Sequence, residues 1–154
     1  MSLYREGPAT RRKAQKEDLM PTRLATCACG QLTASCSDDP TSVSLCHCLQ
    51  CQRRTGTAYG IAAFFQRENV TVAGERKAYI RASDSGYPVT FYFCPHCGST
   101  VYWKPDRKPE MVAVAVGAFA DPAFPPPTVS VYDCRRHPWV QLPPGTTVYE
   151  RDPD

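Results

Sequence analysis

Nine cysteines carry the strongest chemical signal in this 154-residue sequence. Seven of them fall into three close groups: Cys27-Ala28-Cys29, Cys46-His47-Cys48-Leu49-Gln50-Cys51 and Cys94-Pro95-His96-Cys97. Short spacings let two sulfurs approach one metal ion, whereas cysteines so close in sequence rarely form a disulfide with each other. We therefore predict metal binding rather than a disulfide framework, with zinc as the default ion and an iron–sulfur cluster as the alternative.

The first and third groups together predict a closed four-thiolate site. Pro95 fixes the backbone φ of the turn in the third group, and Gly98 allows a positive φ there. A turn of this kind supplies two of the four ligands that a tetrahedral site needs, and the first group is the natural source of the other two. We expect a structural zinc ion bound by Cys27, Cys29, Cys94 and Cys97.

The middle group predicts a different kind of site, because it offers only three thiolates and no second close pair of cysteines remains to complete it. Three protein ligands with one open position are typical of catalytic zinc, and a substrate thiol would suit the open position. We expect a catalytic zinc ion bound by Cys46, Cys48 and Cys51. The alternative is a second structural zinc ion, completed by Cys36, Cys134 or His47.

The elements that must position these groups are short strands separated by Gly, Pro and Asp. Several are rich in β-branched and aromatic residues, and no segment shows helical periodicity beyond about two turns. The pattern predicts a mainly β single domain of short antiparallel strands, stapled by zinc, in which the third cysteine group forms a hairpin. We expect strands over residues 32–36, 61–65, 69–72, 78–81, 89–93, 100–103, 111–116, 129–132 and 146–149.

Composition and charge exclude several classes of protein. A net charge of +3, from 18 Lys+Arg and 15 Asp+Glu, is too small to indicate nucleic-acid binding. The sequence has no apolar run of about 20 residues and no signal-peptide pattern, so we expect no membrane contact and a cytoplasmic location. Residues 1–20 are charged and nearly free of apolar side chains, which predicts a disordered tail before a domain at 21–154.

The ordered cysteine pattern resembles that of the glutathione-dependent formaldehyde-activating enzyme family, which includes the centromere protein V type of domain. The matching motifs are Cys27-x-Cys29-Gly30, Cys46-His47-Cys48-x-x-Cys51-Gln52-Arg53 with Thr55-Gly56, and Phe93-Cys94-x-x-Cys97-Gly98-Ser99. The resemblance spans roughly residues 22–150. It implies a fold similar to methionine sulfoxide reductase B, two zinc ions on the ligand sets given above, and addition of glutathione to formaldehyde, a carbon–sulfur lyase activity. At Ser130 the sequence lacks a His that family members often carry.

The neighbours of the middle group suggest how a thiol substrate would bind. Arg53 and Arg54 could offset the negative charge of three thiolates and attract the carboxylates of glutathione, although a solvated surface pair is the alternative. Tyr59 could donate to the carbonyl oxygen of a small aldehyde, although packing in the core is the more common role of a tyrosine. A different class of function is a non-catalytic zinc-binding module that docks a protein or nucleic acid.

Overall fold

Two β-sheets make up most of the structure in residues 22–153, the part of the chain that the computed structural model describes. The predicted tail, residues 1–20, lies outside the described residues. The smaller sheet has the strand order β1-β2-β5, formed by Arg23–Thr26, Thr33–Cys36 and Val70–Ala73. The larger sheet has the order β11-β10-β3-β4-β9-β8-β7-β6. The mainly β fold predicted from the sequence is confirmed.

Seven strands of the larger sheet differ from the predicted ranges by at most two residues at either end, whereas the strand at Ser42–Cys46 was not predicted. In chain order the strands of this sheet are β3 (Ser42–Cys46), β4 (Gly60–Gln66), β6 (Lys77–Ala82), β7 (Pro88–Phe93), β8 (Thr100–Pro105), β9 (Met111–Ala115), β10 (Val129–Val131) and β11 (Thr147–Val148). The helices of the described residues are α1 (Leu49–Thr55) and three short 3-10 helices, η1 (Arg67–Asn69), η2 (Val116–Phe119) and η3 (Asp133–Arg135). No helix within residues 22–153 is long and apolar enough to cross a membrane.

Most strand pairs are antiparallel, as expected, and β10 is the exception. It runs parallel to both β3 and β11. The chain reaches β10 through the long proline-rich segment after η2. A tight hairpin joins only antiparallel strands, so a strand that runs parallel to its neighbour needs a longer connection. The crossover places the C-terminal part of the chain beside the end of β3, where the middle cysteine group begins.

The larger sheet has two apolar faces because residues alternate along its strands. On β4, Ala63 and Phe65 are fully buried in the main core, whereas Ala62 belongs to a second cluster on the opposite face. The main core lies between the two sheets, and residues such as Leu32, Ala34 and Cys36 supply it from the smaller one. The second cluster contains Ala62, Phe91, Trp103 and Ala113, with Phe64, Val89 and Ala115 against it.

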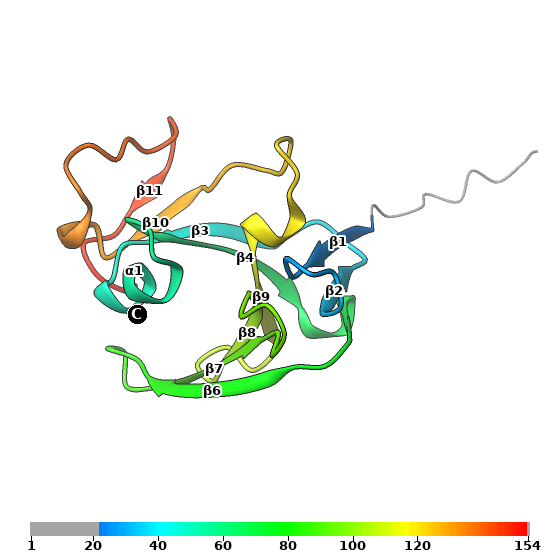
Figure 1. Ribbon diagram of the computed structural model, residues 1–154. Coiled ribbons are helices and arrows are strands. Elements are labelled where there is room, and N and C mark those ends of the chain that lie inside the picture. The colour runs from blue at the N-terminus through cyan, green and yellow to red at the C-terminus, as the bar shows by residue number, and fades with distance from the viewer. Residues whose placement is uncertain (1–21, 154) are drawn as a thin grey trace, which may run out of the picture.

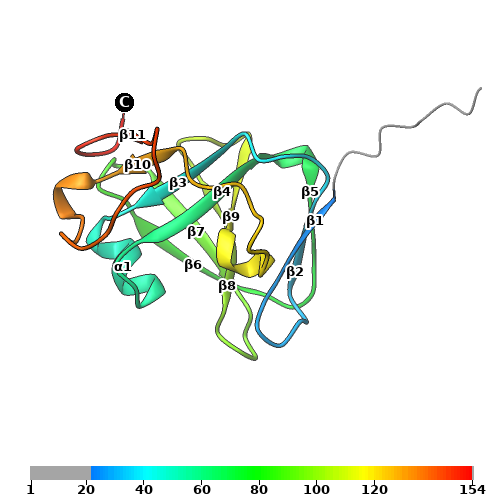
Figure 2. The same ribbon diagram turned by 90° about the horizontal axis from the view of Figure 1, so that it is seen from above.

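The larger sheet curls strongly, so that β3 and β10 at one side face β6 and β7 at the other (Figure 1). The helix α1 lies at the opening of this curl. Seen from above, the smaller sheet of β1, β2 and β5 forms a layer at the end of the molecule opposite to α1 and β11 (Figure 2). The curl therefore creates an inner face that carries the second apolar cluster and opens toward α1.

Candidate active site and metal centres

The first and third cysteine groups meet as predicted in the four-cysteine cluster of Cys27, Cys29, Cys94 and Cys97, whose Sγ atoms all lie within 4.8 Å of one another. The Sγ atom of Cys29 is 3.5 Å from that of Cys27 and 3.6 Å from that of Cys94. A tetrahedral ion with Zn–S bonds of about 2.3 Å requires sulfurs about 3.8 Å apart, whereas a disulfide requires about 2.05 Å. The spacing therefore fits a metal ion.

Two similar turns hold this cluster. In one, the Cys27 N–H donates to the Leu32 carbonyl, and the Leu32 N–H approaches the Cys27 sulfur at 3.3 Å. In the other, the Cys94 N–H donates to the Ser99 carbonyl, and the Gly98 N–H donates to that of Cys94. Gly98 has a φ of 75°, the positive value predicted from the sequence. Each turn thus presents two sulfurs on one side of a rigid loop.

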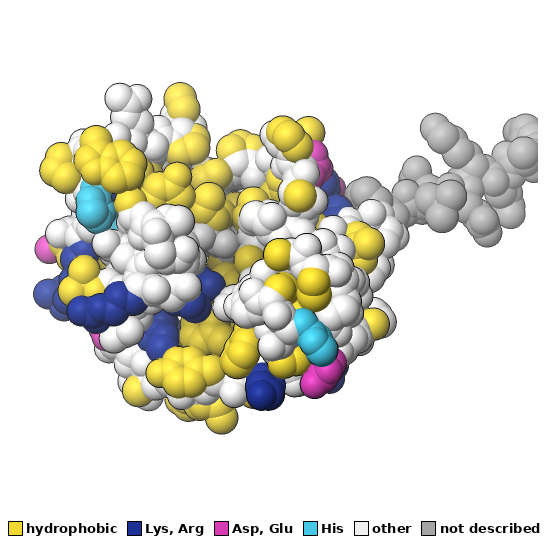
Figure 3. All heavy atoms as spheres, in the orientation of Figure 1, with side chains coloured by type: hydrophobic (Ala, Val, Ile, Leu, Met, Phe, Trp, Pro, Cys, Tyr) yellow, Lys and Arg dark blue, Asp and Glu magenta, His cyan; other side chains and the backbone are white. Residues whose placement is uncertain are grey.

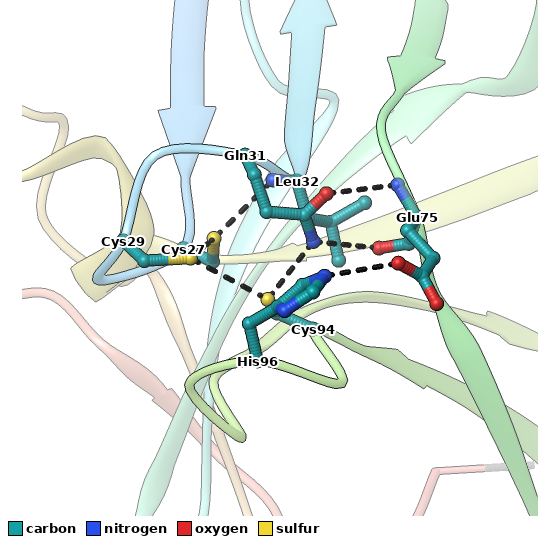
Figure 4. Close-up of polar contacts among 7 residues, drawn as sticks. All are labelled: Cys27, Cys29, Gln31, Leu32, Glu75, Cys94 and His96. Atoms are coloured by element: carbon teal, nitrogen blue, oxygen red, sulfur yellow. Dashed lines mark hydrogen bonds and ion pairs between the residues drawn. The ribbon is translucent and has the colours of Figure 1, made fainter.

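The side chain of Gln31 connects the four-cysteine cluster to the β5–β6 connection. Its Nε2 atom lies 2.9 Å from the Cys94 sulfur and 2.8 Å from the Glu75 carbonyl oxygen, while its Oε1 atom accepts from the Glu75 N–H at 2.9 Å (Figure 4). His96, at the tip of the second turn, contacts the Glu75 carboxylate at 2.9 Å. An N–H donor to a sulfur stabilises thiolate charge, so Gln31 supports a metal ligand from outside the ligand set.

The middle group forms a separate three-cysteine cluster at the junction of β3 and α1, with the Sγ atoms of Cys46, Cys48 and Cys51 within 4.8 Å of one another. Cys46 ends β3, and Cys48 is the N-cap of α1. The Cys48 sulfur accepts from the Cys51 N–H at 3.3 Å, so the cap itself brings two of the three sulfurs together. Among residues 22–153, no other Cys, His, Asp or Glu ligand atom joins this group.

The residues that could have completed the three-cysteine cluster lie elsewhere. Cys36 is buried in the main core, where desolvation raises the pKa of its thiol to about 12. Cys134 is exposed. His47 is fully buried, with its ring edge-on to Tyr59 at 5.8 Å between centroids, and burial lowers the pKa of its imidazole.

Protons are shared unevenly among the cysteines of each cluster. Hydrogen bonding from Cys46 is the main cause that lowers the pKa of the Cys48 thiol to about 2, and the charge of Arg81 adds to it. The pKa of Cys46 is raised in return. In the four-cysteine cluster, hydrogen bonding with Ser99 lowers the pKa of Cys97 to about 5. The pKa values of Cys51 and Cys29 are raised, so in each cluster some thiols keep their protons until a metal ion, which binds thiolates, displaces them.

The three-cysteine cluster opens into a cavity of about 370 Å³ inside the curl of the larger sheet. The volume is in the usual range for a small-molecule site, roughly 300–1,000 Å³. Phe64, Phe91 and Trp103 from the second apolar cluster line it, together with Arg54, Arg81 and Tyr132. In Figure 3, Lys and Arg side chains gather beside apolar ones where α1 faces β6.

The substrate contacts predicted from the sequence fall in different places. Arg54 lines the cavity, whereas Arg53 is exposed and does not. Tyr59 lies on the other side of α1, against His47 and along a separate groove. Ser130 is fully buried on β10, and its hydroxyl has no hydrogen-bond partner among residues 22–153.

Several cavity residues have no local sequence signal. Arg81 lies on an edge strand, and Arg107, which follows β8, forms an ion pair of 3.1 Å with Asp152. The curl of the larger sheet brings these residues to the cavity of the three-cysteine cluster. No spacing within the sequence predicts that position.

The fold and these sites define a class of protein: a small mainly β domain with two cysteine clusters that could hold metal ions, one of them beside a cavity. Residues 22–135 match the family model described as glutathione-dependent formaldehyde-activating enzyme, and the chain therefore belongs to this family. The resemblance predicted from the cysteine motifs is confirmed. Membership supports an enzyme of the formaldehyde-activating kind.

The comparisons with other proteins add little beyond the family. A crystal structure of a Rhodobacter sphaeroides protein, a structural genomics target, aligns with a TM-score of 0.48 and 21% sequence identity. The alignment covers 62% of this chain and 85% of that one. No curated protein gives a match.

Proposed function

We propose that this protein is a zinc-dependent enzyme that adds a small thiol, glutathione in the first instance, to a small aldehyde such as formaldehyde. The observation that carries the proposal is the position of the three-cysteine cluster beside a cavity, with no fourth ligand among the described residues. Family membership supports glutathione and formaldehyde as the pair of substrates. One zinc ion at each cluster agrees with the sulfur-rich donor sets.

The proposed reaction is an addition to a carbonyl group. The thiolate sulfur forms a bond to the aldehyde carbon, the π electrons of the C=O bond move to the oxygen, and that oxygen takes up a proton to give an S-hydroxymethyl adduct. No oxidant or reductant is consumed. The reverse step breaks the carbon–sulfur bond, so we propose a carbon–sulfur lyase activity.

The chain's own residues divide the work between the cluster and the cavity. A zinc ion at the cluster would lower the pKa of a thiol at its open coordination position. Cys46, Cys48 and Cys51 would hold the ion and all three line the cavity, where the guanidinium of Arg54 would offset part of the thiolate charge. The predicted contacts at Arg53 and Tyr59 have no such support.

The four-cysteine cluster has a structural role in this proposal, because its two turns come from different sheets. The expected cytoplasmic location suits a protein whose nine cysteines are free, and it stays a prediction. The sequence-based expectation that nucleic acid is not a partner stays a prediction as well.

Formation of the adduct can be measured directly by NMR with glutathione and ¹³C-labelled formaldehyde. We expect the zinc-loaded protein to raise the rate above the spontaneous one and Cys48→Ser to return it to the spontaneous rate. Cys134→Ser is the matched control, because Cys134 belongs to neither cluster, and it should keep the wild-type rate. An unchanged rate in Cys48→Ser would contradict the mechanism, and no rate enhancement by the wild type would favour a non-catalytic zinc module.

A further inference from the structure

Two arginines reach the cavity from opposite sides and share one aromatic ring. Arg54 comes from the last turn of α1, and Arg81 comes from the edge strand β6. Their Cζ atoms lie 5.0 Å and 5.3 Å from the centroid of Phe91, and that of Arg54 is also 4.6 Å from the centroid of Trp103. Because guanidinium groups stack on aromatic faces, these rings hold both planar groups in place at the cavity wall.

Neither guanidinium forms an ion pair with a carboxylate in the described part of the chain. The Nε atoms of Arg54 and Arg81 are both buried and have no hydrogen-bond partner there. Three arginines of residues 22–153 form ion pairs: Arg23 with Asp39 at 2.8 Å, Arg107 with Asp152 at 3.1 Å, and Arg136 with Asp133 at 2.8 Å. The Nη1 atom of Arg81 donates to the Ala82 carbonyl at 3.0 Å, so the unpaired donors are the two Nε atoms. Buried donors of a charged group without partners are costly, and two of them in one cavity indicate a site for an anion.

The charge of the three-cysteine cluster also bears on which substrate the cavity can bind. Three thiolates and one divalent ion sum to a single negative charge, which by itself would repel an anionic substrate. The two guanidiniums of Arg54 and Arg81 line the same cavity and reverse that sign. The other charged residues that line it are Arg107, Lys108, Asp84 and Asp152, whose charges sum to zero, so one net positive charge remains. A carboxylate is the simplest group to balance it, since guanidinium groups bind carboxylates through paired hydrogen bonds.

We propose that Arg54 and Arg81 form a carboxylate-binding subsite that orients an anionic substrate beside the three-cysteine cluster. This inference rests on the proposed function, and it extends it by assigning a binding role to Arg81 and a charge to the substrate. The carboxylate belongs either to the thiol, as in glutathione, or to the aldehyde, as in glyoxylate. The subsite therefore distinguishes carboxylate-bearing substrates from neutral ones of the same size.

The subsite can be tested by ligand binding alone. S-methylglutathione carries both carboxylates of glutathione and no free thiol, so its binding is independent of catalysis. Trp103 lies beside Arg54, and its fluorescence reports on the cavity once the exposed Trp139 is replaced in a Trp139→Phe background. We expect Arg81→Gln to weaken binding of S-methylglutathione to the zinc-loaded protein by about tenfold or more, equivalent to about 1.4 kcal/mol.

The matched control is Arg53→Gln, which removes the same charge from the adjacent, exposed position outside the cavity and should change binding by less than about twofold. Arg54→Gln should resemble Arg81→Gln. A parallel titration with glyoxylate identifies the source of the carboxylate, because only the anion that uses the subsite loses affinity in Arg81→Gln. Zinc per chain is measured for every variant.

Two results would overturn the inference. Wild-type affinity for both anions in Arg81→Gln and Arg54→Gln would mean that the guanidiniums only offset the charge of the cysteines. Loss of zinc from these variants, with unchanged affinity in the fraction that keeps it, would mean the same. Because S-methylglutathione cannot react, either result is independent of whether the protein catalyses the addition of thiol to aldehyde.

Discussion

The two cysteine clusters use the same side chain in different parts of the fold. The four-cysteine cluster joins two turns, and a sulfur–sulfur contact of 3.6 Å across them links residues 65 positions apart in the sequence, Cys29 and Cys94. The three-cysteine cluster comes from one short segment, between the end of β3 and the first turn of α1. One cluster therefore ties distant parts of the chain together, whereas the other is assembled locally.

This difference predicts what each cluster can be used for. A cross-link between distant segments removes much of the freedom of the unfolded chain, so a metal ion held there contributes to folding. A local cluster gains little in this way, because its three sulfurs are already close in sequence. Its value lies in its surroundings, the cavity with Arg54, Arg81 and an aromatic wall. The three-cysteine cluster has no fourth ligand among the described residues and lies beside the cavity, as the proposed catalytic site requires.

The largest expected effect separates the clusters by stability. Structural zinc sites have apparent binding energies of about 10–16 kcal/mol in small peptides, comparable to the whole stability of a domain. We therefore expect Cys94→Ser to lose most of its stability, and Cys48→Ser to stay within about 1–2 kcal/mol of the wild type. Urea unfolding followed by circular dichroism, with zinc measured per chain, checks both. Equal destabilisation by the two variants would show that both ions are structural.

A smaller effect tests the partners of the ligands rather than the ligands. Gln31 donates directly to the Cys94 sulfur at 2.9 Å, whereas Gln52 donates to the backbone oxygen of His47 at 2.8 Å, within the three-cysteine segment. Loss of a hydrogen bond to a ligand costs about 10- to 100-fold in metal affinity. We expect Gln31→Ala to weaken zinc binding at the four-cysteine cluster by that factor in a chelator competition. Gln52→Ala is the control and should leave this cluster unchanged.

The sequence predicted most of the strands and the grouping of seven cysteines into two clusters because those signals are local, but it missed β1 and β3. Strand alternation and turn residues are visible within a few positions, and the positive φ of Gly98 followed from its place after Cys97. The helix α1 was not predicted, since its seven residues are too few to show a period, and its N-cap is a cysteine rather than a usual capping residue.

The cavity could not be predicted because it depends on the curl of the whole larger sheet. Arg81 and Phe91 lie on β6 and β7, while Arg54 lies on α1, and only the strand order brings them together. Trp103 is buried, and the same ring also forms part of the cavity wall. The face of the larger sheet on which a side chain lies decides whether it packs in the main core or lines the cavity.

The smallest expected effect concerns how dry the cavity is. Tyr132 lines it, and desolvation raises the pKa of the phenol to about 12, compared with about 10 in an unfolded chain. Between pH 10 and pH 12 the phenol is therefore protonated in the folded state and ionised in the unfolded chain. Its contribution to stability is complete below pH 10 and is lost as the pH rises toward 12. The ultraviolet titration of the wild type minus that of Tyr132→Phe isolates this one ionisation. The negative charges of Asp152 and Asp84 raise the pKa of the phenol in the same direction. A step near pH 10 would therefore show that neither desolvation nor these charges act on the ring, and the environment of the three-cysteine cluster would be more like open solvent.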